Sequence, residues 1–497
     1  MTDRASRIAA QSAPLGDTRS AVGDARAPQR ELVRGLGLWD ATAIVAGSMI
    51  GSGVFIVSAD IARQVHAPGW LLVVWMLTGL MTIVGALSYG ELAAMKPQAG
   101  GQYVYLREAY GPLVGFLYGW TLFLVIQTGT IAAVAVAFAK FTAVILPFFD
   151  ARFHIATLPI SAQQILAIVV IAALTGVNCN GLHTGRWVQN VFTATKVGSL
   201  LVLIAFGLLV GRNAAAVRVN LQDFWGAPGV FSLSFLPVIG AAMVGALFSS
   251  DAWNNITFAA GEVRDPARTV PSSLAIGTVM VTALYLATNL VYLATLPLHG
   301  DPGATALSAR GIQFATSDRV ATAAMEVMLG QMGAVVMALG IMVSTFGCVN
   351  GLILSGARVY YAMARDGLFF KSTGFLNTRS VPAPALVLQG IWASVLTLSG
   401  TYSDLLDYVI FAALLFYALT VGAIFILRRR QPTAARPYRA IGYPLVPAGY
   451  IVLATLIMLD LLVMKPRYSW PGLLIVASGG PVFYWWRAAR ARDAYPA

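Results

Sequence analysis

Apolar stretches long enough to cross a lipid bilayer recur from about residue 36 to residue 487, and no other feature limits the fold as strongly. About twenty consecutive apolar residues span the hydrocarbon core as a helix. Only 11% of the 497 residues are charged, whereas about a quarter are charged in typical soluble domains. We therefore expect an all-α membrane protein with twelve transmembrane helices, at residues 36–60, 70–94, 112–147, 161–178, 187–210, 234–262, 270–296, 328–363, 383–400, 404–427, 441–464 and 470–487.

The distribution of basic residues predicts how these helices are oriented. With residues 1–34 in the cytoplasm, 23 of the 33 Lys and Arg fall in cytoplasmic segments, eight fall on the opposite side and two fall within spans. Basic residues concentrate in the cytoplasmic loops of membrane proteins. We therefore expect both termini in the cytoplasm. Residues 1–34 contain no apolar core of a secretory signal, so we interpret them as a disordered cytosolic tail.

The same composition argues against several other classes of function. The basic residues lie in alternate loops and do not alternate with aromatic residues, so we expect no nucleic-acid partner. Cys179 and Cys348 fit neither a disulfide framework nor a metal motif, and we expect reduced, packed thiols. The chain has no nucleotide motif, metal cluster or nucleophile–base arrangement. We therefore expect no enzymatic activity, no cofactor and no metal.

Three glycines interrupt the first apolar stretch within seven residues, at Gly47, Gly51 and Gly53. Glycine weakens a helix, and an unwound helix leaves carbonyl groups at the end of one half and N–H groups at the start of the other. Inside a bilayer such groups persist only where they line a cavity or bind a ligand, and a zwitterion with a carboxylate and an ammonium fits both ends. The alternative is a close helix–helix contact, which small residues also permit.

A polar run with an acidic residue, Asp251, interrupts the sixth apolar stretch at residues 246–256. It comes five spans after the first interruption, and paired interruptions at corresponding positions predict an inverted-repeat transporter with its site between them. We therefore expect two inverted five-helix repeats, at about residues 36–211 and 233–428. They form a core at residues 35–430, and residues 431–497 form accessory helices 11 and 12 with a short cytosolic tail.

Two further charged residues lie in or beside apolar spans. Lys196 lies within span 5, where its ammonium group could hold carbonyl groups of the unwound span 1, much as a sodium ion would. The alternative is that Lys196 extends to the cytosolic interface. Glu262 lies close to Arg264, Asp265 and Arg268, and these four residues are expected to form a solvated cap rather than a gate.

Several motifs in one order resemble the amino acid–polyamine–organocation superfamily, and within it the L-type amino acid transporters and their bacterial relatives. The resemblance covers nearly the whole chain after residue 34. The matching pieces are Gly51-Ser52-Gly53-Val54-Phe55, Gly100-Gly101 through Tyr110-Gly111, Asn178-Cys179, Val188-Gln189 through Lys196, Leu247-Phe248 with Trp253-Asn254 and Glu262, residues 344–351 including Asn350, and Pro481-Val482-Phe483.

The resemblance implies the LeuT-type fold, a 5+5 inverted repeat with spans 1 and 6 discontinuous, and transport of L-amino acids by alternating access. It implies that the substrate carboxylate binds at Gly51, Ser52 and Gly53. It also implies that the amino group binds carbonyl groups at Ser48, Met49, Ile50, Phe248 and Ser249, with Phe248 as an outer lid. Lys196 matches a lysine that links spans 1, 5 and 8 in the family and is tied to sodium independence. Asn350 is assigned a structural or coupling role with it.

The chain departs from the animal members at three places. It has Asp251-Ala252 where they have two glycines, and Asp251 could attract the substrate ammonium, accept a proton or cap the second half-helix, of which we favour the cap. Span 10 has small residues after Phe411, so side-chain specificity does not carry over. The loop at 148–159 has no cysteine for attachment of a heavy-chain glycoprotein partner, so we expect none.

These observations lead to a bacterial inner-membrane transporter of L-amino acids that is sodium-independent and either an exchanger or proton-coupled. Neutral substrates are favoured because the expected pocket lining is largely apolar: Gln127, Thr130, Phe248, Phe411 and Ala413. A cationic amino acid or polyamine antiporter on the same fold is the nearest alternative. A channel or a sensor without flux is the other class, for which the chain shows neither a continuous polar pore nor a soluble output domain. We expect a monomer or weak homo-oligomer in contact with membrane lipid.

Overall fold

The computed structural model describes residues 34–154, 160–226, 235–398 and 402–494. The predicted tail at residues 1–34 lies outside the described residues except for Arg34. Within the described residues every named element is helical, and nine helices are long and apolar enough to cross a membrane. Two more, α11 and α16, are apolar but shorter. The prediction of an all-α membrane protein is therefore confirmed at this level.

The helices follow the predicted apolar stretches closely. In chain order they are α1 (Leu38–Met49), α2 (Gly53–Ile56), α3 (Ser58–Val65), α4 (Pro68–Met95), α5 (Gln102–Tyr110), α6 (Pro112–Thr121), η1 (Leu122–Ile126), α7 (Gln127–Ile145), η2 (Pro147–Phe149), α8 (Ala162–Cys179), α9 (Leu182–Leu209), α10 (Ala214–Gln222), α11 (Leu236–Ser249), α12 (Asn255–Phe258), η4 (Ala260–Glu262), α13 (Pro266–Thr295), α14 (Leu307–Arg310), η5 (Thr316–Asp318), α15 (Val320–Arg365), η6 (Lys371–Gly374), α16 (Ala383–Leu396), α17 (Tyr402–Arg430), α18 (Leu445–Met464) and α19 (Pro466–Ala494).

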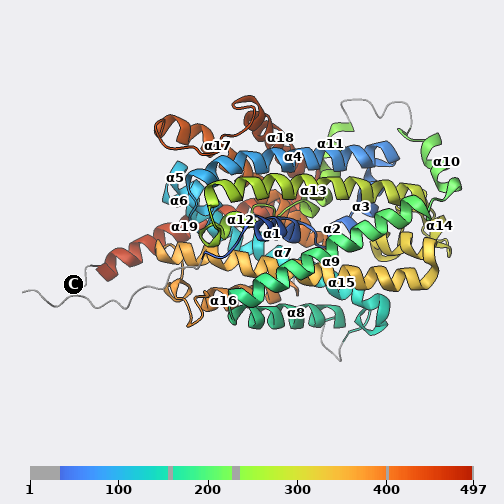
Figure 1. Ribbon diagram of the computed structural model, residues 1–497, viewed down its shortest axis with the longest axis horizontal. Helices are drawn as coiled ribbons and strands as arrows, with labels where there is room; N and C mark the ends of the chain where they lie inside the picture. Colours follow the sequence, from blue (N-terminus) through green and yellow to red (C-terminus); the bar gives the residue numbers. More distant parts are fainter. Residues whose placement is uncertain (1–33, 155–159, 227–234, 399–401, 495–497) are drawn as a thin grey trace, which may run out of the picture. The chain divides into compact units, whose positions relative to one another are not determined.

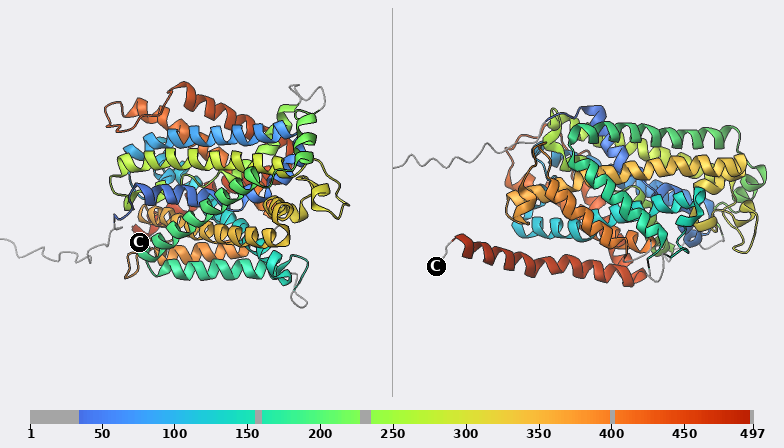
Figure 2. Two further views of the ribbon diagram at one scale, coloured as in Figure 1. Left: turned by 45° about the vertical axis from the view of Figure 1, so that its right-hand side comes forward. Right: turned by 90° about the horizontal axis from the view of Figure 1, so that it is seen from below.

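The long helices α4, α13, α9, α15 and α8 run side by side in a bundle (Figure 1). Helix α13 packs against α4, α1 and α9, and α15 packs against α7 and α9. Small residues permit this close packing where lipid provides no hydrophobic drive between helices. At the crossing of α13 and α1, a Cβ atom on Gly277 would lie 2.8 Å from the Cβ of Val45. From a second direction, α19 lies along one side of the bundle, against α6 and α17 (Figure 2).

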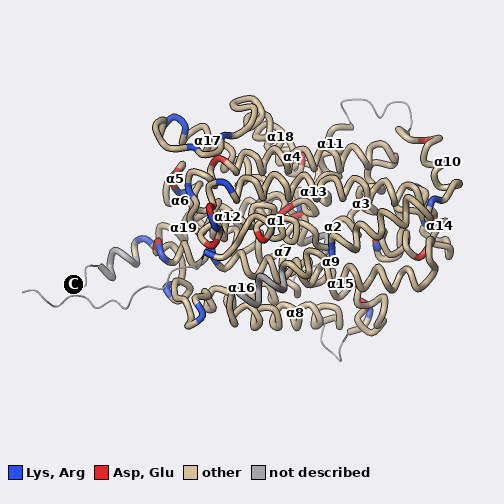
Figure 3. The backbone as a smooth tube through the Cα atoms, viewed as in Figure 1, with Lys and Arg blue, Asp and Glu red and all other residues tan. Residues whose placement is uncertain are grey.

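Charged residues gather toward the two ends of the helices, and the middle of the bundle is mostly uncharged (Figure 3). Large apolar side chains are exposed along the helix flanks, among them Leu80 of α4, Leu201 of α9 and Leu456 of α18. Backbone groups must be paired internally in a bilayer, and helices with apolar flanks satisfy that condition. The arrangement is that of a multi-pass membrane protein.

The expectation for Glu262 is wrong. Its side chain is 1% exposed and forms an ion pair with Arg358 of α15, with Arg358 Nη2 3.0 Å from Glu262 Oε2. Arg264, Asp265 and Arg268 are exposed, as expected of a solvated cap. Glu262 differs because its partner, Arg358, is distant in sequence. A buried carboxylate loses its hydration, and pairing with a guanidinium group compensates for part of that loss.

Candidate functional site

The two predicted helix interruptions lie in direct contact. Helix α1 ends at Met49 and α2 begins at Gly53, whereas α11 ends at Ser249 and α12 begins at Asn255. A Cβ atom on Gly53 would lie 2.6 Å from the Cβ of Ser249 and 2.8 Å from its Cα. Only glycine fits at this contact. The close helix–helix contact, one of the two alternatives left open by the sequence, is therefore present at this glycine, and ligand binding at the interruption stays a prediction.

Lys196 of α9 is fully buried and binds the carbonyl end of α1. Its Nζ donates to Gly47 O at 2.7 Å and to Ile50 O at 2.9 Å. The last carbonyl groups of a helix have no partner within the helix and carry partial negative charge. An ammonium group therefore suits this position. The side chain does not extend to an interface, which was the alternative considered for it.

Two side chains of α15 bind the same segment. Ser344 Oγ lies 3.2 Å from Ile50 O and 3.2 Å from Gly51 O, and Cys348 Sγ lies 3.2 Å from Ser48 O. Both cysteines are free thiols, and Cys348 is buried. The carbonyl groups at the first interruption thus accept hydrogen bonds from side chains of two other helices, α9 and α15.

Tyr285 of α13 joins the two interruptions. Its hydroxyl group lies 2.9 Å from Met49 O and 3.0 Å from Ser249 O, the last residues of α1 and α11. The residue is buried. Met49 O also accepts from Gly51 N at 2.8 Å, and the hydroxyl group has a single proton to share between the two carbonyl oxygens. That shared hydrogen bond keeps the ends of the two helices close together.

Tyr285 is not among the residues predicted from the sequence, although the sequence contains a signal for it. Asn289 and Tyr292 follow it on the same face of α13, four and seven residues later. Ser58 Oγ donates to Asn289 Oδ1 at 2.7 Å, and Tyr292 Oη donates to Val54 O at 3.1 Å. The polar face of α13, an otherwise apolar span, therefore contacts α1, α2 and α3 in turn. Polar residues at helical spacing within an apolar stretch could have indicated it.

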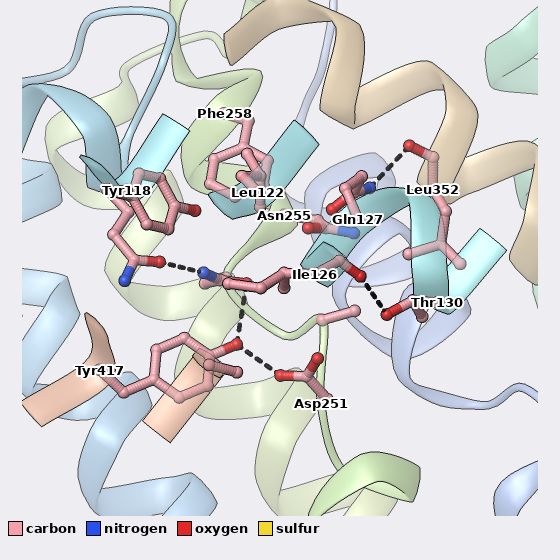
Figure 4. Close-up of a pocket in the computed structure, with 14 residues that line it drawn as sticks. Tyr118, Leu122, Ile126, Gln127, Thr130, Asp251, Asn255, Phe258, Leu352 and Tyr417 are labelled. Atoms are coloured by element: carbon pink, nitrogen blue, oxygen red, sulfur yellow. Dashed lines mark hydrogen bonds between the residues drawn. The ribbon is translucent and has the colours of Figure 1, made fainter. Parts of the chain in front are cut away.

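A small cavity lies beside the second interruption (Figure 4). Its volume is about 10 Å³, which is room for about one water molecule. Of the predicted pocket residues, Gln127, Thr130 and Ala413 line it, as does Asp251. Its wall includes the π-helical turn η1, which the sequence did not predict, and such turns are frequent at functional sites.

Asp251 does not cap the second half-helix, so the favoured interpretation of this residue is wrong. The residue before α12 is Asn254, and it makes no side-chain capping bond. Three residues separate Asp251 from the helix, and Ala252 has a φ of 62° that turns the chain. The Asp251 carboxylate instead accepts a 2.5 Å hydrogen bond from the hydroxyl group of Tyr417 in α17 (Figure 4).

A chain of polar side chains continues from Asp251 to the short helix α5. Tyr417 Oη lies 3.5 Å from Asn254 Oδ1, and Asn254 Nδ2 donates to Gln102 Oε1 at 2.8 Å (Figure 4). All four residues are buried. The second interruption is thereby tied to α17 on one side and to the start of α5 on the other.

The remaining predicted residues are dispersed around the interruptions. Phe248 is 6% exposed in the last turn of α11, and its carbonyl group accepts from Asp251 N at 3.2 Å. Phe411 is buried near Gly472 of α19 and is not among the residues that line the cavity. Asn350 accepts from Asn178 Nδ2 at 2.8 Å and so joins α15 to α8 rather than to α1.

In the part of the chain that the structure describes, nine apolar spans and two apposed helix ends define a polytopic helical membrane protein with a polar centre. The chain belongs to the amino acid permease family, whose model matches residues 36–483. This membership confirms the resemblance to the amino acid–polyamine–organocation superfamily.

Curated relatives match most of the chain. The b(0,+)-type amino acid transporter 1 of Homo sapiens is 29% identical over 459 residues, which cover 91% of this chain and 88% of the relative. The Large neutral amino acids transporter small subunit 2 of Homo sapiens is 31% identical over 458 residues, covering 91% and 80%. The Asc-type amino acid transporter 1 of Mus musculus is 29% identical over 465 residues, covering 92% and 82%. The family and these relatives are transporters, in agreement with the expectation that the chain is not an enzyme.

Proposed function

We propose that the chain is a secondary active transporter that moves L-amino acids across the bacterial inner membrane by alternating access. The observation that carries this proposal is the contact between the two helix interruptions, joined by the Tyr285 hydroxyl group. The Tyr285 hydroxyl group holds the two half-helices by their terminal carbonyl groups. A ligand that competes for those carbonyl groups would change how the half-helices are placed relative to one another. The names of the relatives support an amino acid as that ligand.

The substrate binds across the two interruptions. Its carboxylate meets the start of α2 at Gly51, Ser52 and Gly53, where Ser52 makes no side-chain capping bond and the helix end carries partial positive charge. Its ammonium group meets carbonyl groups among Ser48, Met49, Ile50, Phe248 and Ser249. Each carbonyl oxygen has two lone pairs, so one that already accepts from Lys196 or Tyr285 still accepts from a substrate.

The architecture we propose has twelve spans, of which α1 with α2 and α11 with α12 are the discontinuous spans 1 and 6. Residues 36–211 and 233–428 form the two inverted repeats, and α18 and α19 are the accessory helices of residues 431–497. Both termini lie in the cytoplasm, because the larger share of Lys and Arg falls on that side. The protein is a monomer or weak homo-oligomer with no heavy-chain partner, since residues 148–159 contain no cysteine.

Transport is independent of sodium because Lys196 supplies a positive charge at the carbonyl end of α1. The ammonium group lies within 2.9 Å of two carbonyl oxygens there, which is the kind of site that a sodium ion would need. Asn350 has a structural role, since it joins α15, whose Ser344 contacts the same end of α1, to α8. The driving force is exchange or proton coupling.

Neutral amino acids are the proposed substrates, since Leu122, Ile126, Phe258 and Leu352 make much of the cavity lining apolar. A second candidate is a cationic amino acid or polyamine antiporter on the same fold. It is favoured by Asp251, a buried carboxylate beside the second interruption. A ligand with a second positive charge would pair with that carboxylate in place of its bond to Tyr417.

Solute counterflow in proteoliposomes tests the proposal. Vesicles loaded with unlabelled leucine, alanine or arginine should accumulate the labelled form of the same amino acid, without sodium in either compartment. A channel would equilibrate the label without accumulation, and a sensor would show no flux. Failure of all three amino acids to drive counterflow would contradict the proposed function, and accumulation of arginine alone would favour the second candidate.

A further inference from the structure

A larger cavity lies apart from the small one, at the end of the bundle where α3 and η5 meet the junction of α18 and α19. Its volume is about 380 Å³, which falls in the range of ligand-binding pockets. Its apolar wall includes Val57 after α2, Gly245 of α11 and Leu406 of α17. Nothing in the proposed binding of substrate at the interruptions uses this cavity, which we name the charged cavity after the residues that line it.

The charged cavity begins one helical turn from both interruptions. Val57 follows Gly53 by four residues, and Gly245 precedes Ser249 by four residues. The two wall residues are themselves close, since a Cβ atom on Gly245 would lie 3.0 Å from the Cβ of Val57. A ligand in the cavity is therefore separated from the interruptions by a single layer of packed side chains. Movement of α2 relative to α11 would open that layer.

Carboxylates in the wall are already paired. Asp318 accepts from Arg63 Nη1 at 2.7 Å, and Asp407 accepts from Lys465 Nζ at 2.8 Å. Asp60 accepts from Gln64 Nε2 at 2.7 Å and lies 3.6 Å from Arg63 Nη2, but its side chain is 52% exposed, against 35% for Asp318 and 12% for Asp407. Asp60 is therefore the carboxylate that is most accessible to a new cation.

Arg467 is the cation of the cavity wall that has no such partner. It lines the cavity from the first turn of α19, and it makes no hydrogen bond or ion pair with any residue in the part of the chain that the structure describes. A guanidinium group presents a fork of donors that matches a carboxylate. The wall thus offers one free cationic group and one accessible carboxylate, and the charges of Asp60, Asp318 and Asp407 are balanced by those of Arg63, Lys465 and Arg467.

We propose that the charged cavity is a second binding site for a zwitterionic amino acid, with its carboxylate on Arg467 and its ammonium group on Asp60. A simple anion would satisfy Arg467 alone, and a simple cation would satisfy Asp60 alone. This inference rests on the proposed function and adds to it a second substrate site one helical turn from the interruptions. Binding there raises the local concentration of substrate next to the interruptions.

The test uses the full chain in detergent and in proteoliposomes, with Arg467→Gln as the variant and Arg218→Gln as the matched control. Arg218 is an exposed arginine on α10 that does not line the cavity. Tritiated alanine, leucine and arginine serve as probes.

The wild-type chain and the control should bind about two molecules of a transported amino acid, and Arg467→Gln about one. The apparent KM of Arg467→Gln should rise about five-fold at unchanged kcat, since a charge-assisted hydrogen bond is lost at a partly exposed site. Arg467→Lys should recover part of this loss.

One bound molecule in the wild-type chain, or an unchanged KM in Arg467→Gln, would overturn the inference while leaving the proposed function intact. Displacement of the second molecule by excess acetate or propylamine as effectively as by an amino acid would also overturn it, because the site would then not recognise a zwitterion. Absence of binding and counterflow for all three amino acids in the wild-type chain would contradict the proposed function itself.

Discussion

Gly53 of α2 lies directly against Ser249 of α11, so that a Cβ atom on Gly53 would lie 2.6 Å from the Cβ of Ser249. The contact involves the backbone as well, with the Cα of Ser249 at 2.8 Å from the same point. Rotation of a side chain cannot relieve it. The two interrupted helices are therefore held at a separation that only glycine permits, and the proposed substrate site depends on that separation.

Gly53→Ala should separate the two interruptions and reduce amino acid uptake at least ten-fold. Overpacking of this kind costs about 1–3 kcal/mol, and part of it would appear as a lower melting temperature. Uptake into proteoliposomes and thermal unfolding measure the two effects. Gly176→Ala on α8 is the control, because a Cβ atom there meets no atom within 4 Å and should leave both quantities unchanged. Normal uptake by Gly53→Ala would contradict the importance of the contact.

Tyr285→Phe removes the hydroxyl group that joins α1 to α11 and keeps the ring. One shared donor is lost, and Met49 O keeps its bond from Gly51 N, so the cost is about 1–3 kcal/mol in total and we expect uptake to fall about ten-fold with the fold retained. Tyr360→Phe is the matched control. Tyr360 is a fully buried tyrosine of α15 whose hydroxyl group has no hydrogen-bond partner among the described residues. Equal uptake by the two variants would show that the bridge has no part in transport.

Lys196→Ala removes the ammonium group from the end of α1, and uptake should fall by ten-fold or more, because Gly47 O and Ile50 O lose a charge-assisted donor. Lys140→Ala, which removes a lysine from α7, is the control and should transport normally. Lys196→Arg keeps a positive charge at this position but does not release a proton. The variant therefore distinguishes a role of the charge from a role in proton transfer. Uptake by this variant, followed against external pH, should be flat if the lysine carries the coupled proton. A pH profile equal to that of the wild-type chain would exclude that role.

Asp251→Asn tests the two candidate substrates. Its amide still reaches Tyr417, so the local structure should survive. If neutral amino acids are the substrates, uptake of leucine and alanine should change less than about three-fold. If a cationic amino acid is the substrate, arginine uptake should fall by ten-fold or more, since the buried counter-charge is lost. Loss of arginine uptake, with no leucine or alanine uptake in either form, would count against the neutral assignment.

Arg358→Met should destabilise the protein more than the double variant Arg358→Met with Glu262→Gln. The single change leaves the Glu262 carboxylate buried without its partner, which typically costs about 3–5 kcal/mol, whereas the double change removes both charges. Thermal unfolding in detergent measures both variants. A double variant at least as unstable as the single one would show that the buried ion pair is not the relevant interaction.

Much of the helical architecture could be predicted from the sequence, because apolar stretches and basic loops reflect a bilayer directly. The apolar helices, the short helix α5 and the helix ends at residues 50–52 and 250–254 lie where local composition indicated them, whereas the count of twelve spans stays a prediction. Glycines and polar runs within apolar segments are local features, and their cost in a bilayer does not depend on the rest of the fold. Lys196 was recognised for the same reason.

The partners of these groups were decided by the tertiary structure. The sequence placed Asp251 at an interruption but not beside Tyr417, and it placed Glu262 near exposed charges but not beside Arg358. Nor did it show that one hydroxyl group, that of Tyr285, reaches the ends of both α1 and α11. Local sequence determines which groups a membrane helix must expose or bury. Which donor satisfies each of them depends on contacts between residues more than 30 positions apart, and only the packing of helices brings those residues together.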